Sequence, residues 1–198
     1  MNVAVVKYNA GNIFSVMNAL RRLGVEPLLT DKSEELQSAD CVIFPGQGEA
    51  NATMTYLREH GLDRVITSLQ RPVLGICIGQ QLLCRHSEEG DTDCLGVFDV
   101  DVIRFRPQRH EDKVPCMGWN MLYNTATPLM KGLEGEYVYF VHSYYVPLCQ
   151  YNIATTDYIL PYIAALCRDN FYTTQFHPEK SGSAGEQILT NFLKIANS

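Results

Sequence analysis

The chain has 198 residues, of which 46% are hydrophobic and 19% are charged, and its formal net charge is −6. This length is enough for one self-sufficient core, so we expect a single domain over residues 1–198. The acidic balance argues against nucleic acid or an anionic membrane as a partner. No segment has the apolar length of a membrane span, and the start "MNVAVVKYN" predicts a first strand rather than a signal peptide.

The cysteine pattern indicates a reducing environment. Seven cysteines form an odd set without a C-x-x-C pair, which argues against a disulfide framework and against a zinc ribbon. We therefore expect a cytoplasmic protein with no metal and no cofactor.

Along the first half of the chain, short β-branched runs alternate with amphipathic segments. Strands are expected in "VAVVKY", "VEPLLT", "CVIFPG" and "PVLGIC", and helices in "IFSVMNALRRLG", "SEELQSA" and "LDRVITSLQ". In residues 13–24 one helix face collects the apolar positions Ile13, Val16, Met17, Leu20 and Leu23, and Gly24 supplies a stop. This alternation is typical of βαβ units with a mostly parallel sheet.

The second half changes to strand-like segments separated by turn residues. Strands are expected in "LGVFDVDVIRFR", "MGWNMLYN", "YVYFVHSYYV", "YNIATTDY", "YIAALC" and "FYTTQF", before a closing helix in "AGEQILTNFLKIAN". Three arginines, Arg104, Arg106 and Arg109, alternate along an apparent strand and indicate a solvated edge rather than a phosphate site. The expected fold is α/β, with a mostly parallel open sheet flanked by helices and an added antiparallel portion.

The segment "VLGICIGQQLL" frames Cys77 between Gly75 and Gly79 at a strand-to-helix junction. A sharp turn there forces the central residue into a sparsely allowed backbone region, and small neighbours avoid clashes. The free N–H groups of a helix beginning near Gly79 would stabilise a thiolate. From this segment alone, a buried structural thiol is an equally good interpretation. The other six cysteines lack such a frame and are interpreted as structural.

A nucleophilic cysteine needs a base, and the base needs a group that orients it. In "QFHPEK", His177 and Glu179 project to the same side if the segment is extended, with Pro178 fixing the backbone between them. The carboxylate would set the imidazole tautomer and leave the second ring nitrogen for the thiol. The alternative is a surface salt bridge after a strand.

The remaining histidines are weaker candidates for the base. His60 precedes a glycine at an expected helix end, His86 is placed on the helix after the cysteine, and His110 lies in the polar stretch "PQRHED". All three are expected at the surface. His142, in "FVHSYY", is interpreted either as a buried strand histidine or as part of a site wall.

The third candidate element is the loop "PGQG" that follows the strand in "CVIFPG". Glycines at such a strand end allow backbone N–H groups to face a substrate, as an oxyanion hole requires. One donor would be the N–H of Gln47 and the other the N–H of Ile78, directly after the nucleophile. An ordinary β-turn is the alternative interpretation of this loop.

The three motifs follow expected strands, and open α/β sheets build active sites at the carboxyl ends of their strands. At this point the sequence resembles the class I (triad-type) glutamine amidotransferases, most specifically in "GICIGQQLL" and "FHPEKS". The segments "YNAGNIFSV", "MGWN" and "YFVHSYY" further resemble the glutaminase subunits of imidazole glycerol phosphate synthase. The resemblance covers essentially the whole chain and implies a flavodoxin-like core.

The resemblance also implies a mechanism and residue roles. The thiolate would attack the side-chain amide of glutamine, and water would hydrolyse the thioester to glutamate while ammonia leaves. The triad would be Cys77, His177 and Glu179, with oxyanion donors at Gln47 and Ile78. Glutamine would contact Gly46, Gly48, Gln81, Ser143 and Tyr144.

The implied partner is a (β/α)₈-barrel cyclase subunit that consumes the ammonia in histidine biosynthesis, in a heterodimer with this chain. The surface facing the cyclase would include Asn12, Trp119, Asn120, Tyr139 and Lys180. Glutaminase activity without the cyclase is expected to be weak, because an uncoupled cycle would waste glutamine.

Three features depart from the pattern of the family: Glu49-Ala50 after the loop, Gln80 in the elbow, and Cys116 before "MGWN". They bear on the loop conformation and basal activity rather than on the triad. Two alternatives remain for the function. One is the glutaminase of pyridoxal phosphate synthase, which shares elbow and triad, and the other is a redox-sensing cysteine protein of the DJ-1 type.

Overall fold

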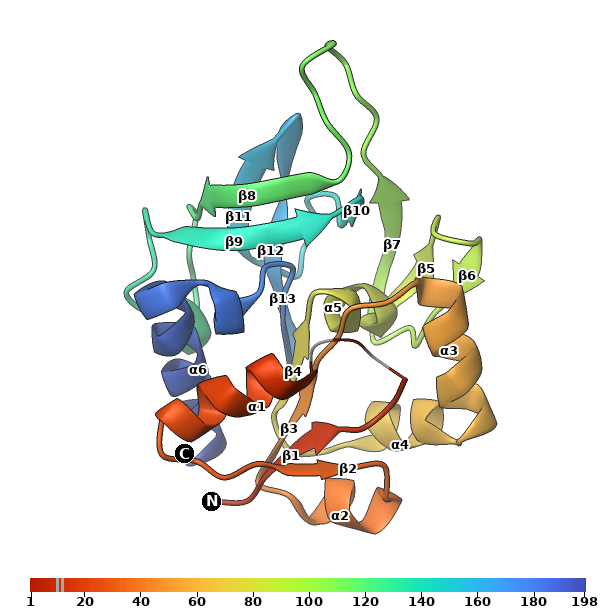
Figure 1. Ribbon diagram of the computed structural model, residues 1–198, viewed down its shortest axis with the longest axis vertical. Helices are drawn as coiled ribbons and strands as arrows, with labels where there is room; N and C mark the ends of the chain where they lie inside the picture. The colour runs from red at the N-terminus through yellow and green to blue at the C-terminus, as the bar shows by residue number, and fades with distance from the viewer. Residues whose placement is uncertain (10, 12) are drawn as a thin grey trace.

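The computed structural model describes residues 1–9, 11 and 13–198, and its centre is a seven-stranded sheet in the order β11-β12-β13-β4-β3-β1-β2 (Figure 1). Five neighbouring strands are parallel: β13 (Phe171–Thr174), β4 (Val73–Ile76), β3 (Cys41–Phe44), β1 (Val3–Val6) and β2 (Leu28–Thr30). Taken in chain order these five strands have the flavodoxin-like order 2-1-3-4-5. Two antiparallel strands, β12 (Leu160–Arg168) and β11 (Asn152–Tyr158), extend the sheet beyond β13.

Helices cover both faces of the sheet. One face packs against α1 (Ile13–Arg22) and α6 (Gly182–Ala196). The other packs against α2 (Ser33–Ser38), α3 (Ala50–Glu59), α4 (Leu62–Ser68) and α5 (Ile78–Leu83). Successive residues of β1 alternate between the two apolar clusters, with Val3 and Val5 in one and Ala4 and Val6 in the other, as the period of a strand requires. Burial on both faces explains why β1, β3 and β4 are continuous apolar runs.

Two smaller sheets lie beside the carboxyl ends of the central strands (Figure 1). The four-stranded one has the order β10 (Tyr144–Tyr145), β7 (Phe98–Arg104), β5 (Cys84–Ser87) and β6 (Thr92–Asp93). The second is an antiparallel ribbon of β8 (Cys116–Met121) and β9 (Tyr137–His142). Two 3₁₀ turns, η1 (Pro128–Met130) and η2 (Pro178–Lys180), complete the elements. The predicted fold class, a mostly parallel sheet with helices and an antiparallel portion, is confirmed.

The first helix follows its sequence pattern closely. Ile13, Val16, Met17 and Leu20 are buried, and Leu23, just past the helix, is half-buried. Gly24 has a φ of 79°, and its N–H donates to the carbonyl of Arg21. A left-handed residue at this position closes the helix, and glycine adopts it without strain.

Two local predictions are wrong. His86 lies on β5, because α5 ends at Leu83 and the chain turns directly into a strand. Arg106 and Arg109 lie beyond the end of β7 at Arg104, where they pair with Glu88 and with Glu111 and Asp112. All three arginines are exposed, so the solvated interpretation of their side chains is confirmed.

None of the helices in the described part of the chain is long and apolar enough to cross a membrane.

Candidate active site

The three motifs are brought together because their strands are neighbours in the sheet. The strands β3, β4 and β13 lie side by side, with Phe44 paired to Gly75 and Ile76 paired to Thr174. The residues that follow these strand ends, Pro45, Cys77 and Gln175, therefore emerge at one edge of the sheet. This is the place where open α/β folds build their sites.

Cys77 occupies a strained turn between β4 and α5. Its φ of 54° and ψ of −106° lie outside the regions that L-residues usually adopt, and its N–H donates to Thr174 O at 2.8 Å. A Cβ on Gly79 would overlap the carbonyl oxygen of Phe44, and a Cβ on Gly75 would lie 2.9 Å from the backbone carbon of Gly79. The close packing explains both glycines, and the backbone strain is typical of a nucleophile elbow.

The helix after the nucleophile begins one residue earlier than expected, at Ile78, and has only six residues. Its first N–H groups have no partner within the helix. Ile78 follows the nucleophile directly and lines the same pocket as Cys77; its role as an oxyanion donor stays a prediction.

His177 and Glu179 form a buried pair. His177 Nδ1 lies 2.8 Å from Glu179 Oε1, and the two side chains are 1% and 2% exposed. The prediction of an extended segment is wrong, because Pro178–Lys180 is a 3₁₀ turn. The turn still brings the two side chains together, and their burial excludes the alternative of a surface salt bridge.

The electrostatics of His177 favour the imidazolium. Burial by itself lowers the pKa of His177, but the Cys77 thiol and the Glu179 carboxylate outweigh burial and raise it to about 10. Because a carboxylate only accepts, Nδ1 donates to Glu179 and Nε2 is the nitrogen left for the thiol. No hydrogen bond of normal geometry joins Nε2 to a described residue, although Cys77 lies near enough to interact electrostatically with the ring. Catalytic hydrogen bonds are often long or poorly aligned before substrate binds.

The loop "PGQG" packs directly against the elbow. A Cβ on Gly46 would lie 2.6 Å from the Ile78 side chain and would also overlap the Tyr8 hydroxyl. That hydroxyl donates to the carbonyl of Pro45, and the carbonyl of Gln47 accepts from Gly11 N–H at 3.0 Å. The backbone of Gln47 is therefore held beside the elbow, where the sequence predicts the second oxyanion donor.

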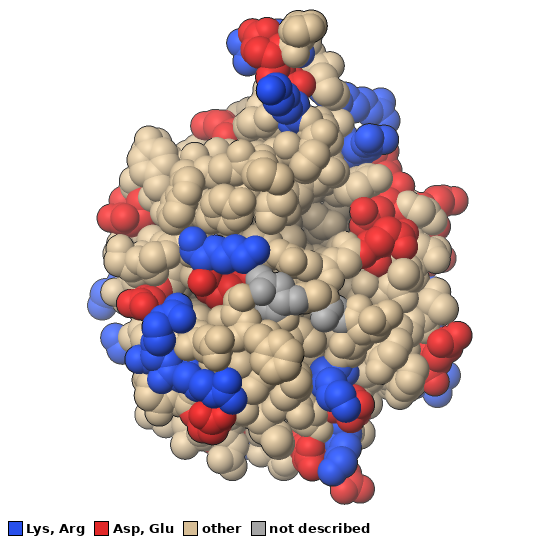
Figure 2. Space-filling view, in the orientation of Figure 1, with Lys and Arg blue, Asp and Glu red and all other residues tan. Residues whose placement is uncertain are grey.

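A pocket of about 220 Å³ opens beside the sulfur. Its lining includes the predicted residues Gly48, Cys77, Ile78, Gln81, Ser143 and Tyr144, together with Glu89, Pro115, Val141 and His142. The surface is hollowed near the end of β9, with acidic side chains on one rim (Figure 2). Of the predicted glutamine-binding residues, only Gly46 lies outside the lining, because it is buried beneath Tyr8 and Ile78.

Glu89 is a pocket residue that the sequence did not reveal. Its Oε2 accepts from Ala50 N–H at 2.9 Å, at the start of α3, and burial raises its pKa despite this hydrogen bond. Glu49 caps the same helix by accepting from Asn51 and Ala52. In the sequence Glu89 stands in "SEEG", which resembles an ordinary solvated charge pair, so no local signal separates it from Glu88.

His142 fits both interpretations made from the sequence, a buried strand histidine and part of the pocket wall. It is a buried residue of β9, and it lines the pocket. Burial lowers its pKa to about 4, so the ring is neutral. Nδ1 donates to Tyr144 O at 2.7 Å, which leaves Nε2 to accept from the Tyr162 hydroxyl at 3.1 Å.

The other cysteines are free, and several of them are poor nucleophiles because partial or complete burial raises the pKa of the thiol. Burial raises the pKa of Cys41 and Cys94 to about 12 and that of Cys116 to about 11. Because the thiolate is the reactive form, these thiols are inert at neutral pH.

The predicted partner residues fall around the β8–β9 ribbon. Trp119 is 52% exposed, and its ring meets that of Tyr139 with centroids 5.9 Å apart. Lys180 is exposed at the end of η2, whereas the side chain of Asn120 faces the other side of the ribbon and donates to Asp157 O at 3.0 Å. Asn12 lies outside the described residues.

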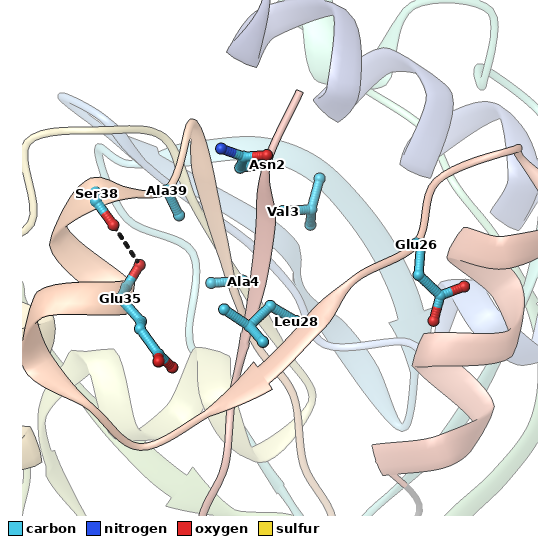
Figure 3. A pocket seen from close by; sticks show the side chains of 8 residues that line it. All are labelled: Asn2, Val3, Ala4, Glu26, Leu28, Glu35, Ser38 and Ala39. Carbon is cyan, nitrogen blue, oxygen red and sulfur yellow. Dashed lines mark hydrogen bonds between the residues drawn. The ribbon is translucent and has the colours of Figure 1, made fainter.

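A second pocket, of about 150 Å³, lies at the opposite end of the sheet (Figure 3). Its acidic residues already have partners, since Glu35 binds Thr30 and Lys32 and Glu26 binds Arg21. Its lining contains no cysteine or histidine. Across the described residues, 1–9, 11 and 13–198, no group of three or more His, Cys, Asp or Glu could hold a metal ion.

Solved structures support the fold. A putative GMP synthase protein from Thermoplasma acidophilum superposes with a TM-score of 0.75 over 100% of this chain and 94% of that one, at 22% identity. A glutamine amidotransferase structure gives a TM-score of 0.74 over the whole of both chains, at 21% identity.

Sequence comparison identifies the family. The model for "Glutamine amidotransferase class-I" matches residues 4–196. The imidazole glycerol phosphate synthase subunit HisH of Bacteroides thetaiotaomicron is 63% identical over 98% of this chain and 100% of its own length. The HisH subunit of Escherichia coli (strain K12) is 43% identical, again over 98% of this chain and 100% of its own length. The chain therefore belongs to the class I glutamine amidotransferases and, within them, to the HisH subunits of imidazole glycerol phosphate synthase.

Proposed function

We propose that Cys77, His177 and Glu179 hydrolyse glutamine to glutamate and ammonia, as the glutaminase activity of an imidazole glycerol phosphate synthase. The observation that carries this proposal is the buried His177–Glu179 pair beside a strained cysteine at one sheet edge. The same pair argues against the alternative of a redox sensor, which has no need of an oriented base. The full-length likeness to HisH subunits argues against the pyridoxal phosphate pathway.

The reaction follows from the charges of the site. The Cys77 thiolate attacks the amide carbon of the substrate side chain, and the N–H groups of Gln47 and Ile78 stabilise the developing oxyanion. His177 donates its Nε2 proton to the leaving nitrogen, while Glu179 holds the ring in place. Water then attacks the thioester, with His177 as the base, and releases glutamate.

We assign recognition of the α-ammonium group of glutamine to Gln81 and Glu89, which line the pocket together with Cys77. The NH₂ group of Gln81 donates to Tyr144 O at 2.9 Å and to Gln175 Oε1 at 3.0 Å, which leaves its Oε1 as an acceptor. Together with the Glu89 carboxylate, this oxygen forms a suitable receptor for the α-ammonium group of glutamine. Gly48, Ser143 and Tyr144 supply backbone groups for the rest of the amino acid.

The proposed partner is a cyclase subunit in a heterodimer, docked on the β8–β9 ribbon. Four large apolar side chains are exposed on the ribbon: Met117, Trp119, Met121 and Tyr137. Register pairs Trp119 with Tyr139 and Met121 with Tyr137, so these side chains share one face, and Figure 2 shows few charged side chains over β8 and β9. Exposed aromatic patches of this kind are typical of protein interfaces. We place the complex in the cytoplasm, in keeping with the free thiols.

The test is glutamine hydrolysis by this chain, alone and with the cyclase of imidazole glycerol phosphate synthase and its nucleotide ligand. We expect slow turnover alone and stimulation in the complex. Replacement Cys77→Ala should abolish both rates, because the thioester can no longer form. Turnover that survives Cys77→Ala would refute the chemistry, and a lack of stimulation by the cyclase would refute the pairing.

A further inference from the structure

Three glutamine side chains lie buried beneath the nucleophile. Gln80 and Gln175 are 0% exposed and Gln81 is 4% exposed. The Oε1 of Gln175 accepts from Gln81 Nε2 at 3.0 Å and, over a longer 3.5 Å, from Gln80 Nε2. The Nε2 of Gln175 lies 3.9 Å from Cys77 Sγ. One amide thus contacts both the nucleophile and a residue of the glutamine pocket.

The orientation of the Gln175 amide is fixed by a backbone group. The carbonyl of Tyr144 can only accept, so Gln81 must present its NH₂ group at the 2.9 Å contact. The second proton of that NH₂ group points to Gln175, so Gln175 must accept it with its Oε1. The NH₂ group of Gln175 is then the part that faces the sulfur.

A second chain of hydrogen bonds gives the same orientation. The N–H of Leu166 donates to Thr173 Oγ1 at 3.0 Å, and the Thr173 hydroxyl donates to Gln80 Oε1 at 2.7 Å. Gln80 therefore turns its NH₂ group toward Gln175. Thr173 is also fully buried, so water does not compete for these groups.

Besides His177, the sulfur of Cys77 has two polar neighbours of opposite kind. The carbonyl of Val141, at 3.9 Å, accepts from the neutral thiol, and the NH₂ group of Gln175, also at 3.9 Å, donates to the sulfur. Ionisation makes the carbonyl contact unfavourable and the N–H contact favourable. A thiolate on a residue that is only 7% exposed gains from such a donor, because burial removes much of the hydration of the charge.

We propose that Gln175 is a positioning residue that donates a hydrogen bond to the Cys77 thiolate and, by the same amide, holds Gln81 toward the substrate. This inference rests on the proposed role of Cys77 as the nucleophile. The Gln175 side chain would thus link the ionisation of Cys77 to the position of Gln81 in the glutamine pocket.

The test compares wild type with Gln175→Glu and Gln175→Met. The glutamate keeps an oxygen for Gln81 but turns a second oxygen, instead of an N–H, toward the sulfur, whereas methionine removes both contacts. The measurement is the rate of Cys77 alkylation by iodoacetamide against pH, with the site identified by peptide mass. We expect the pH at which the alkylation rate is half-maximal to rise by roughly one to two pH units in both variants. Alkylation at a fixed lower pH then slows about tenfold to a hundredfold.

Steady-state kinetics of glutamine hydrolysis separate the effects of the two contacts of Gln175, one to Cys77 and one to Gln81. Gln175→Glu should lower kcat with little change in KM, and Gln175→Met should lower kcat and raise KM, because Gln81 loses its support. Gln80→Met removes only the longer hydrogen bond to Gln175. It should shift the alkylation profile less than Gln175→Glu or Gln175→Met does. Asn191→Leu is the matched control, since it removes a buried amide on α6 that binds Leu129 O and Lys131 O; its alkylation profile should equal that of wild type.

The proposal is overturned if Gln175→Met is folded, as judged by circular dichroism and thermal unfolding, and alkylates with the wild-type pH profile. This holds even where Gln175→Glu fails to fold. A shift of equal size in Asn191→Leu would also overturn it, because the effect would then be structural. A failure of the proposed function is distinguishable, since it would appear as wild-type protein that hydrolyses no glutamine while alkylation remains measurable.

Discussion

At the scale of single residues, the two buried histidines of the site differ in the charge that their surroundings favour. Burial alone lowers the pKa of His177, and only its neighbours Cys77 and Glu179 raise it to about 10. Because this value lies above the ordinary 6.5, the stabilisation from these contacts is fully present below pH 6.5 and is lost as the pH rises through about 10. His142, with a pKa lowered to about 4, stays neutral beside it. The surroundings thus favour a protonated ring at His177 and a neutral hydrogen-bonding ring at His142.

The first residue-scale prediction concerns Glu89. Glu89→Gln should raise KM for glutamine about tenfold or more with a smaller effect on kcat, because a charged hydrogen bond to the α-ammonium is lost. The raised pKa of Glu89 also predicts that wild-type affinity falls with decreasing pH sooner than an ordinary carboxylate would allow. Steady-state kinetics across pH measure both effects.

Glu88→Gln is the control for this prediction. The carboxylate of Glu88 binds Arg104 N–H at 2.7 Å and pairs with Arg106, outside the pocket lining. Equal KM values for the two variants would contradict the assignment of Glu89.

At the scale of elements, the site depends on three strand ends and on how closely α5 approaches β3. The turn after β4 holds Cys77 at a φ of 54°, and nothing larger than glycine fits at position 79 against the Phe44 carbonyl. On the other side, Tyr139 O accepts from His177 N–H at 2.9 Å, and the Ser181 hydroxyl donates to His177 O while accepting from Tyr139 N–H. His177 is therefore tied to β9 directly and through the Ser181 hydroxyl.

The prediction at this scale is that Gly79→Ala destabilises the fold. The added methyl group meets a backbone carbonyl that cannot move without displacing β3, so the free energy of unfolding should fall by about 1–3 kcal/mol. Gly11→Ala is the control, because its Cβ would find its nearest neighbours on Gln47 at an ordinary 3.7 Å. Denaturant unfolding measures both, and equal stabilities would contradict the close approach.

At the scale of the whole molecule, the pocket beside Cys77 and the proposed docking surface on the β8–β9 ribbon adjoin each other. The pocket opens beside Cys77, and the β8–β9 ribbon, with its exposed Trp119, carries the end of β9 that forms the pocket wall at Val141 and His142. A partner bound to this ribbon would therefore contact an element that also lines the pocket proposed for glutamine.

Trp119→Ala should weaken cyclase binding about tenfold to a hundredfold, because large aromatic side chains at the centre of an interface contribute most of its energy. Leu148→Ala is the control, since Leu148 is 55% exposed but lies in the loop between β10 and β11. Titration calorimetry with the purified cyclase measures the Kd. Unchanged affinity for Trp119→Ala would contradict the docking surface.

The sequence predicted the fold class and the elements well where the signal is local. The period of α1, the alternating strands and helices, and the glycine frame of Cys77 each follow from steric or hydrophobic rules that act within a dozen residues. The errors occurred where a short segment has no period of its own. The strand at His86 and the 3₁₀ turn after His177 are each four residues or fewer, and their conformation is set by the sheets against which they pack.

The sequence by itself determined the chemistry: a cysteine in a strained turn, an imidazole with a nearby carboxylate, and a glycine loop, each after its own strand. Only the tertiary structure decided that these strands are neighbours, that Glu89 rather than Glu88 faces the pocket, and that Gln175 turns its NH₂ group to the sulfur. The reason is physical. Backbone strain and hydrophobic period are encoded by adjacent residues, whereas burial and hydrogen-bond direction depend on groups brought together from across the chain, such as Tyr144, Gln81 and Gln175.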